Sequence, residues 1–307
     1  MSEQPREPST PGGYEQITYA VADRVATVTL NRPEARNGYT LRMAEEISAA
    51  LHAAEADSAV RVIVLTGAGQ NFCVGADLSG GGGAEGQERS FSANADARTL
   101  AEVAAGTYQE PAGLVTRVMY AMNKPVIAAV RGAAVGVGST MLLPADYRLA
   151  SVDCRFGFPF SRRGIVPEGA SVWFLPRLVG TGTALDWLVS GRLVAADEAL
   201  RAGLVNSLHE PDKVLEAAYD LAAELVAHTA PVSVAIIRQM VYRMAWADSP
   251  EQTHRLDSRL VFDTVRGADA VEGVKSFFER REPHFPGRVP EDLPDYLPWR
   301  AGEQARD

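Results

Sequence analysis

The glycine-rich stretch from residue 130 to 146 reads VRGAAVGVGSTMLLPAD and contains no carboxylate before Asp146. If the chain is an enzyme that moves protons, its acid or base must stand elsewhere. Glu168, in VPEGAS, is the candidate, because apolar neighbours desolvate a carboxyl and raise its pKa toward neutral pH. Its aromatic neighbours in the sequence include Phe156, Phe158, Phe160 and Trp173. The alternative for Glu168 is a helix N-terminal acid, because a helical run follows it and the helix dipole favours a carboxylate there.

Other chemistries have less support in the sequence. The five histidines are scattered and form no i, i+4 pair, and Cys73 and Cys154 belong to no CxxC motif, which argues against a metal site and a disulfide framework. Ser139 and Thr140 have no histidine near them in sequence, and GxSxG is absent. The run GVGSTM lacks the lysine of a phosphate-binding P-loop.

Composition narrows the class of partner. The chain has 307 residues, 46% of them hydrophobic, with a formal charge of −9 and a pI near 5.2. An acidic chain of this size predicts a sizeable core and no nucleic-acid or anionic-membrane partner. No signal-peptide pattern opens the chain, and the most apolar segment is interrupted by Arg131, so we expect a cytoplasmic protein without a membrane span.

Strand-like and helical runs alternate in the first half. Residues 15–21 and 24–30 predict a hairpin, and residues 40–56 predict a helix capped by Thr40. Strands buried on both faces are expected at 61–67 and 125–130, with a further strand at 146–151. This order indicates an α/β domain built from right-handed βαβ units around a largely parallel sheet.

The second half reads as mostly helical. Helical patterns occur at 170–180, 183–191, 195–203, 214–227, 233–245 and 271–281. Residues 283–298 carry five prolines, so an extended tail is expected there, pinned to the body by Trp299. The glycine-rich run 79–87 and the small, polar residues up to Pro111 predict a mobile flap beside a site.

Five segments, in this order and spacing, resemble the crotonase superfamily, the enoyl-CoA hydratase/isomerase family. They are LNRPEARN (30–37), LTGAGQNFCVGADL (65–78), KPVIAAVRGAAVGVGSTMLLPADYRLAS (124–151), SGRLVAADEALRAGLVNSL (190–208) and EGVKSFFERR (272–281). The resemblance covers about residues 15 to 285. It implies the ClpP/crotonase-like spiral fold of repeated ββα units with a C-terminal helical region, and an acyl-CoA thioester as substrate.

The resemblance also implies an oxyanion hole, in which two backbone amides hold the negative charge of the thioester carbonyl. By motif, the donors are the amides of Ala76 and Val137. Val137 departs from the usual GGG run, and a valine is compatible with this role only if its side chain points away from the thioester. The alternative is that both glycine-rich turns are merely tight connections.

The hydratases of this family use two glutamates, whose places Thr140 and Phe160 occupy here, so ordinary two-glutamate hydration is not expected. Glu168 is similar in position to the single catalytic carboxylate of the peroxisomal-type Δ3,Δ2-enoyl-CoA isomerases. The resemblance therefore predicts that Glu168 shifts a double bond by proton transfer. Thr140 and the four aromatic side chains named above are then expected to line the acyl pocket.

Contacts to coenzyme A are implied for six residues: Arg36, Ala76, Asp77, Leu78, Phe277 and Arg280. Arg162 and Arg163 could pair with the phosphates of coenzyme A or with Glu168 itself. No cofactor is expected beyond the coenzyme A carried by the substrate.

The expected organisation is a disordered lead at 1–13, a crotonase core at 14–210, a helical trimerisation region at 211–285 and a Pro-rich tail at 286–307. A homotrimer or hexamer is expected. Two alternatives stay open: a hydratase or lyase acting on an unusual acyl-CoA, and an acyl-CoA-binding protein without catalysis.

Overall fold

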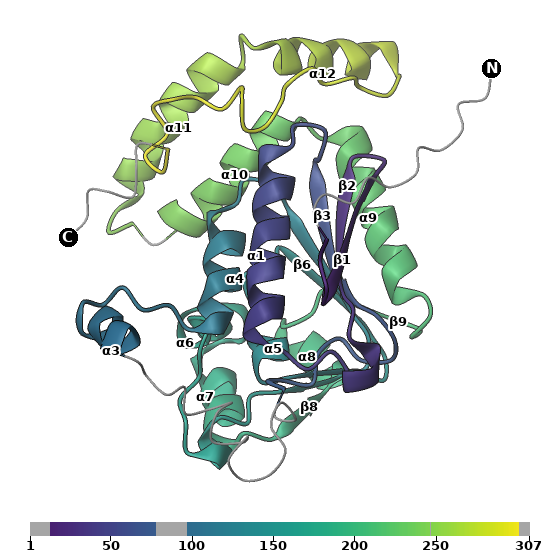
Figure 1. Cartoon of the computed structure of the whole chain (residues 1–307). Coiled ribbons are helices and arrows are strands. Elements are labelled where there is room, and N and C mark those ends of the chain that lie inside the picture. Colours follow the sequence, from purple (N-terminus) through teal and green to yellow (C-terminus); the bar gives the residue numbers. More distant parts are fainter. Residues whose placement is uncertain (1–12, 78–96, 246, 301–307) are drawn as a thin grey trace.

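The computed structural model describes residues 13–77, 97–245 and 247–300 (Figure 1). The predicted N-terminal lead up to residue 12 and the glycine-rich run at 79–87 lie outside the described residues. The later part of the predicted flap contains a short helix, α3 (Ala97–Ala104), which the sequence pattern did not reveal.

A six-stranded sheet forms the centre of the molecule, in the order β1-β2-β3-β4-β6-β9. Its strands are β1 (Ile17–Ala22), β2 (Val25–Leu30), β3 (Val62–Gly67), β4 (Val126–Val130), β6 (Tyr147–Ser151) and β9 (Ser207–His209). Every pairing from β2 to β9 is parallel, and only the β1–β2 hairpin is antiparallel. Asp23 and Arg24 both have positive φ, at 49° and 65°, as a two-residue type I′ hairpin turn requires. The predicted hairpin and the largely parallel sheet are confirmed.

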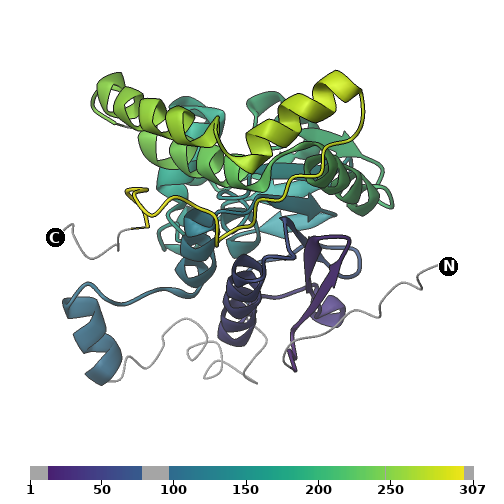
Figure 2. The same cartoon turned by 90° about the horizontal axis from the view of Figure 1, so that it is seen from above.

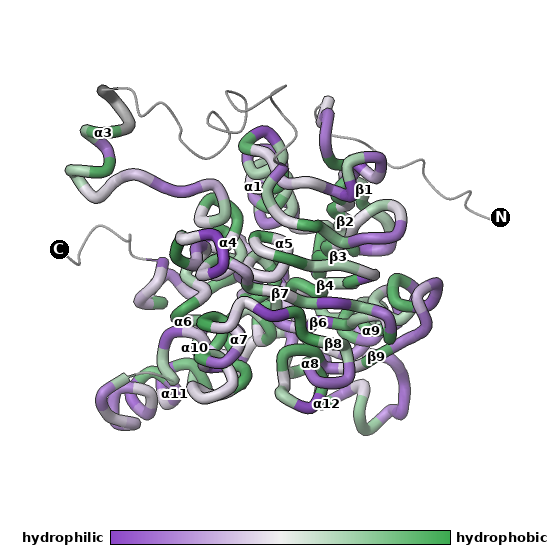
Figure 3. The backbone as a smooth tube through the Cα atoms, turned by 90° about the horizontal axis from the view of Figure 1, so that it is seen from below, coloured by the Kyte–Doolittle hydropathy of each residue, from purple (hydrophilic) through white to green (hydrophobic). Residues whose placement is uncertain are grey.

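Helices cover both faces of this sheet (Figure 1). Helices α1 (Leu41–Ala56) and α4 (Pro111–Ala121) lie against one face, and α9 (Val214–His228) lies against the other. Alternate residues of β3 follow this division, since Ile63 and Leu65 join the main core while Val62 and Val64 pack toward α9. Both sets are buried, and residues 62–65 form a continuous hydrophobic run, in keeping with the green colour near the β3 label in Figure 3.

Helix α1 begins where the sequence predicts. Thr40 has extended backbone angles, and its hydroxyl accepts a hydrogen bond from the Met43 amide at 3.0 Å, which satisfies one of the free amides of the first turn.

A smaller sheet lies below the first and carries much of the candidate site. Its strands β5 (Ala133–Val135), β7 (Arg155–Gly157) and β8 (Leu193–Ala195) pair in the order β5-β7-β8. The short helical segments of this layer are η1 (Pro33–Ala35), α5 (Val137–Thr140), η2 (Ser161–Arg163), α6 (Ser171–Val179), α7 (Thr181–Ser190) and α8 (Ala196–Ala202).

Three helices and an extended tail form the C-terminal region. They are α10 (Pro231–Met244), α11 (Pro250–Thr264) and α12 (Ala268–Glu279), and α11 was not among the predicted helices. Figure 2 shows α11 and α12 along the edge of the molecule remote from α1. In the tail, Val289, Leu293 and Leu297 are buried in a separate apolar cluster against which Trp299 packs. The prediction that Trp299 pins the tail is confirmed, whereas the tail is extended only to about residue 288 and continues as a series of turns.

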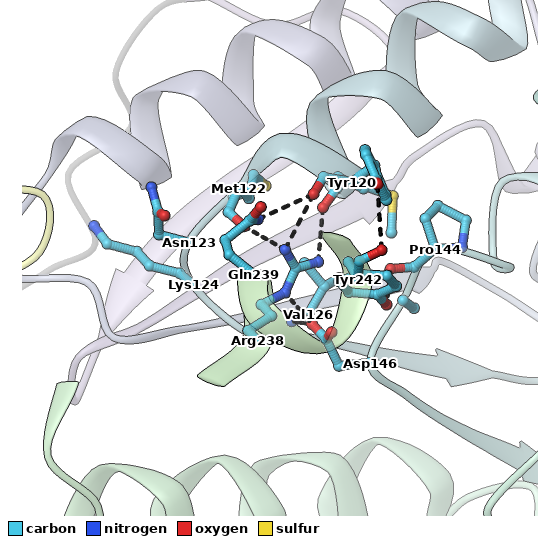
Figure 4. Close-up of polar contacts among 12 residues, drawn as sticks. Tyr120, Met122, Asn123, Lys124, Val126, Pro144, Asp146, Arg238, Gln239 and Tyr242 are labelled. Carbon is cyan, nitrogen blue, oxygen red and sulfur yellow. Dashed lines mark hydrogen bonds and ion pairs between the residues drawn. The ribbon is translucent and has the colours of Figure 1, made fainter. Parts of the chain in front are cut away.

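Helix α10 is joined to the core by a buried arginine (Figure 4). The Arg238 guanidinium donates to Asp146 at 2.8 Å and to the carbonyl oxygens of Met119 and Met122 at the end of α4. Asp146 also accepts from the Val126 amide at 2.7 Å. The first carboxylate after the glycine-rich stretch is therefore engaged in structure.

Within the described residues, no single helix is long and apolar enough to cross a membrane. Helices α9 and α10 pass such a test only as a pair, and the chain bends by 115° between them.

Candidate active site

Two glycine-containing turns lie side by side at the edge of the small sheet. Cys73 and Ala134 form a parallel bridge, in which the Val135 amide donates to the Cys73 carbonyl at 3.0 Å. Gly75 and Gly136 also lie close together, since a Cβ on Gly136 would be 3.7 Å from the Gly75 Cα, and Ala76 and Val137 directly follow these two glycines. Gly138 allows this approach, because a Cβ at that position would collide with the Cys73 carbonyl oxygen.

The amides of Ala76 and Val137 donate no hydrogen bond to any part of the chain that the structure describes. Ala76 is exposed, and Val137 is the first residue of α5. The Val137 side chain is buried in the main core, so the valine that replaces the usual glycine points away from the surface. Two neighbouring free amides, one exposed and one at a helix start, form an arrangement able to bind an oxyanion.

Glu168 lies in a tight turn just before α6. Its Oε1 accepts a hydrogen bond from the Thr140 hydroxyl at 2.7 Å, and Thr140 is the last residue of α5. The side chains of Glu168 and Thr140 thus meet beside the turn that carries the Val137 amide. The turn continues through Gly169 and Ala170 with φ of 62° and 54°, and the Ser171 amide donates to the Glu168 carbonyl.

The pKa of Glu168 is raised to about 7. Burial is the largest cause, since it disfavours the ionised form, and the charge of Glu110 raises the pKa further. The Thr140 hydroxyl acts in the opposite direction, because it donates to the carboxylate. A carboxyl with this pKa is present in both protonation states near neutral pH, as an acid–base catalyst requires.

Glu110 is a second carboxylate that the sequence analysis missed. It precedes Pro111 at the start of α4, and its Oε1 accepts a hydrogen bond from the Gly169 amide at 2.9 Å. The Tyr39 hydroxyl donates to the Pro111 carbonyl at 3.0 Å. Burial, Glu168 and Glu110 all raise the pKa of Tyr39 above its usual range. The site therefore holds two carboxylates and a tyrosine, drawn from distant parts of the chain.

Neither nearby arginine neutralises Glu168, which has no ion pair within the described residues. Arg162 donates to the Ser190 carbonyl at 2.6 Å, and Arg163 donates to the Pro159 carbonyl at 3.2 Å. Both side chains belong to exposed residues within η2. Among the described residues, neither arginine therefore forms the ion pair that would have lowered the pKa of Glu168.

Of the four aromatic side chains predicted to line the acyl pocket, three lie in the core and one is only partly buried. Phe156, Phe158 and Phe160 are all buried in the main core. The Phe158 ring stacks on Trp187 at a centroid distance of 6.3 Å. Trp173 is only partly buried and lies under the Arg177 guanidinium, 3.9 Å from the ring centroid. Contact of these rings with an acyl chain stays a prediction.

The comparisons with known proteins agree on the family. Residues 21–288 match the model of the enoyl-CoA hydratase/isomerase family. The chain belongs to this family. It is 38% identical over 265 residues to a protein of Alternaria alternata named an enoyl-CoA hydratase, covering 86% of this chain and 83% of that protein. It is 30% identical over 281 residues to the 1,2-epoxyphenylacetyl-CoA isomerase of Escherichia coli, covering 89% and 99%.

Solved structures bear out the crotonase-like α/β fold with its C-terminal helices. A putative enoyl-CoA hydratase from Streptomyces coelicolor superposes with a TM-score of 0.78 at 30% identity, covering 94% of this chain and all of that one. A probable enoyl-CoA hydratase/isomerase from Mycobacterium abscessus gives a TM-score of 0.75 at 31% identity, covering 88% and 98%. An acyl-CoA thioester is consistent with membership of this enoyl-CoA hydratase/isomerase family.

The residues predicted to contact coenzyme A in this member of the family lie in separate places. Arg36 is exposed at the end of η1, with a φ of 51°. Asp77 forms an ion pair with Arg32 at 2.8 Å. Leu78 lies outside the described residues. Phe277 and Arg280 belong to α12 and its end, and α12 lies at the top of the molecule in Figure 1, well away from α5. Their predicted contact with coenzyme A would therefore have to be made in another subunit.

The described residues form no site for metal binding or for thiol chemistry. No group of three or more His, Cys, Asp or Glu side chains there could hold a metal ion. Cys73 and Cys154 are both buried and unbridged, and burial is the largest cause that raises the pKa of each thiol to about 12.

Proposed function

We propose that this family member shifts a double bond in an enoyl-CoA, with Glu168 as the single proton carrier. The observation that carries the proposal is the partly buried Glu168 carboxyl, hydrogen-bonded to Thr140 and with a pKa raised to about 7, close to the free Val137 amide. This combination supports the likeness to the peroxisomal-type Δ3,Δ2-isomerases that the sequence around Glu168 suggests.

The proposed reaction uses one carboxylate twice. Ionised Glu168 removes a proton from C2 of a 3-enoyl thioester, and the electron pair delocalises through the C3–C4 double bond and onto the thioester oxygen. The amides of Ala76 and Val137 stabilise that negative charge. Protonated Glu168 then returns the proton at C4, which leaves the double bond between C2 and C3 and consumes no water. A carboxyl of pKa about 7 suits both steps.

Hydration is the second candidate function, and the specific observation in its favour is the presence of Glu110 beside Glu168. Two carboxylates facing one site can orient a water molecule and supply the proton that completes its addition. The Alternaria relative is named a hydratase, which supports the same candidate. In this chain the second carboxylate comes from the residue just before α4, and Thr140 and Phe160 stand at the two places that the family resemblance assigns to the glutamates of hydratases.

We also propose that copies of the chain assemble through the C-terminal helices. Phe277 and Phe278 on α12 are each 77% exposed, and Val261 and Phe262 on α11 are 63% and 60% exposed. Apolar side chains gathered on neighbouring helices favour burial against another subunit. The trimer expected from the family resemblance would provide it.

A mass-resolved assay separates these functions. Purified protein is incubated separately with a 3-enoyl-CoA and a 2-enoyl-CoA, and the products are followed by mass and by double-bond position. Isomerisation conserves mass and moves the bond, whereas hydration of the 2-enoyl substrate adds the mass of one water. Binding of either thioester without turnover would contradict both enzymatic functions and indicate an acyl-CoA-binding protein.

A further inference from the structure

Glu110 occupies a place in the site that helix capping alone does not explain. Its side chain caps no amide of α4, although the residue stands at the N-cap position. The carboxylate crosses instead to the turn before α6, where its Oε1 accepts from the Gly169 amide at 2.9 Å. The bond joins residues 59 positions apart. The acceptor, Glu110, directly precedes Pro111, whose carbonyl accepts a hydrogen bond from the Tyr39 hydroxyl.

The turn that receives this bond is conformationally demanding. Gly169 and Ala170 have consecutive left-handed φ values of 62° and 54°, and Ala170 has a Cβ, so this conformation persists only where the surroundings impose it. Gly169 packs closely on α4, because a Cβ there would lie 3.3 Å from the Thr116 methyl group. A hydrogen bond to the Gly169 amide therefore fixes the peptide that directly follows Glu168.

Helix α4 is shaped to admit this carboxylate. A Cβ at position 113 would lie 2.7 Å from the Glu110 Oε1 and 3.3 Å from its Cδ, so the glycine at this position leaves the necessary space. The other carboxylate oxygen, Oε2, is buried and has no hydrogen-bond partner in the described structure.

We propose that Glu110 is a positioning residue for Glu168, which holds the Glu168 turn through the Gly169 amide and places a second negative charge beside the base. The proposal rests on the proposed function of Glu168 as the proton carrier. Its electrostatic part follows from like charges at close range, since each additional negative charge disfavours ionisation of a neighbouring carboxyl. The effect of Glu110 on the pKa of Glu168 has this sign.

Two variants distinguish the effect of the charge of Glu110 from the effect of the position of its carboxylate. Glu110→Gln keeps an oxygen that can accept from the Gly169 amide and removes the charge. Gly113→Ala keeps the charge and displaces the carboxylate, and because the displaced atoms end a flexible side chain, the helix should fold. Glu45→Gln, an exposed acid on α1, is the matched charge control.

The first readout is the titration of Glu168 itself, followed through the infrared band of its protonated carboxyl and assigned by difference against Glu168→Gln. In Glu110→Gln the midpoint should move to lower pH, and the acidic limb of kcat/KM should move with it, while Glu45→Gln leaves both unchanged. An unmoved midpoint in Glu110→Gln would overturn the electrostatic part. Because this titration needs no turnover, it tests Glu110 even if Glu168→Gln remains active and the proposed function fails.

The second readout is kcat, measured for Gly113→Ala in the wild-type background and in a Glu110→Ala background, after the melting temperatures have shown that the variants are as stable as their parents. Gly113→Ala should lower kcat by roughly ten- to hundredfold, the scale of a catalytic group displaced by about 1 Å. The same change made in a Glu110→Ala background should cause no further loss, because the carboxylate that it displaces is already absent. Equal losses in the two backgrounds would show that Gly113 acts independently of Glu110, and the positioning role would be wrong.

Discussion

Replacement of Thr140 by valine tests the electrostatics of the site most specifically. Valine has nearly the shape of threonine and no hydroxyl, so Thr140→Val removes the 2.7 Å hydrogen bond to Glu168 with little change in packing. Thr140 is fully buried and ends α5, so water cannot readily replace the lost donor. In Thr140→Val, Glu168 should therefore ionise less readily than in the wild type.

The size of the effect follows from hydrogen-bond energies. A bond to an ionised acceptor contributes about 1.5–3 kcal/mol and a bond between neutral groups about 0.5–1.5 kcal/mol, so the hydroxyl favours ionised Glu168 by roughly 1–1.5 kcal/mol. One pKa unit corresponds to about 1.36 kcal/mol, so the pKa of Glu168 should rise from about 7 to roughly 8. At neutral pH the ionised fraction then falls from about one half to about one tenth.

The assay is the pH dependence of kcat/KM for isomerisation of a 3-enoyl-CoA, which reports ionisations of the free enzyme. Thr140→Val should move the acidic limb upward by about one unit and lower the rate about fivefold at neutral pH, with partial recovery in alkaline buffer. Thr27→Val is the control, because the Thr27 hydroxyl is hydrogen-bonded to the Tyr219 hydroxyl far from the site and to no carboxylate. An acidic limb that stays in place, or moves to lower pH, would refute the assignment of the limb to Glu168.

Three further predictions concern stability and the two turns. The folded-state pKa of Glu168 is raised from 4.5 to about 7, so its contribution to stability is fully present below the lower value and is lost as pH rises through the upper one. The melting temperature of Glu168→Gln relative to wild type should therefore rise as pH increases from about 5 to about 8. The corresponding change in the difference between their free energies of unfolding is at most about 3 kcal/mol. A difference that does not depend on pH would contradict this prediction. Arg238→Met should lower the free energy of unfolding by about 3–5 kcal/mol, because it leaves Asp146 partly buried without its cation; a chemical denaturation curve like that of wild type would contradict this. Gly138→Ala should separate the turns at the Cys73 carbonyl and reduce kcat by about 10²–10³, the loss typical of an oxyanion-hole donor; unchanged kcat in a folded variant would show that the turns tolerate separation.

The elements with a repeated hydrophobic pattern could be predicted from the sequence. The β3 and β4 strands are continuous buried runs, and Thr40 caps α1 as its residue type suggests. Strands β5, β7 and β8 have only three residues each, too few to show a periodicity. Helix α11 was missed because it buries only Leu260, and its pattern lacks a continuous apolar face.

The site was only partly predictable for a similar reason. Glu168 follows a recognisable motif, whereas Glu110 reads as an ordinary acid before a helix-starting proline. Its approach to Gly169 depends on the packing of α4 against the turn before α6, which leaves no local signal in the sequence. The room that Gly113 provides is the one available indication, and it becomes meaningful only when the helix is in place.

The central claim is that Glu168 carries the proton. Its most direct test is the reaction of a 3-enoyl-CoA in D2O with the wild-type protein and with Glu168→Gln, followed by mass and by the position of the double bond. The account predicts a shifted double bond with wild type, with deuterium at C4 in those turnovers in which protonated Glu168 exchanges with solvent, and the loss of both in a folded Glu168→Gln variant. Isomerisation and deuterium entry at the wild-type rate in Glu168→Gln would contradict it.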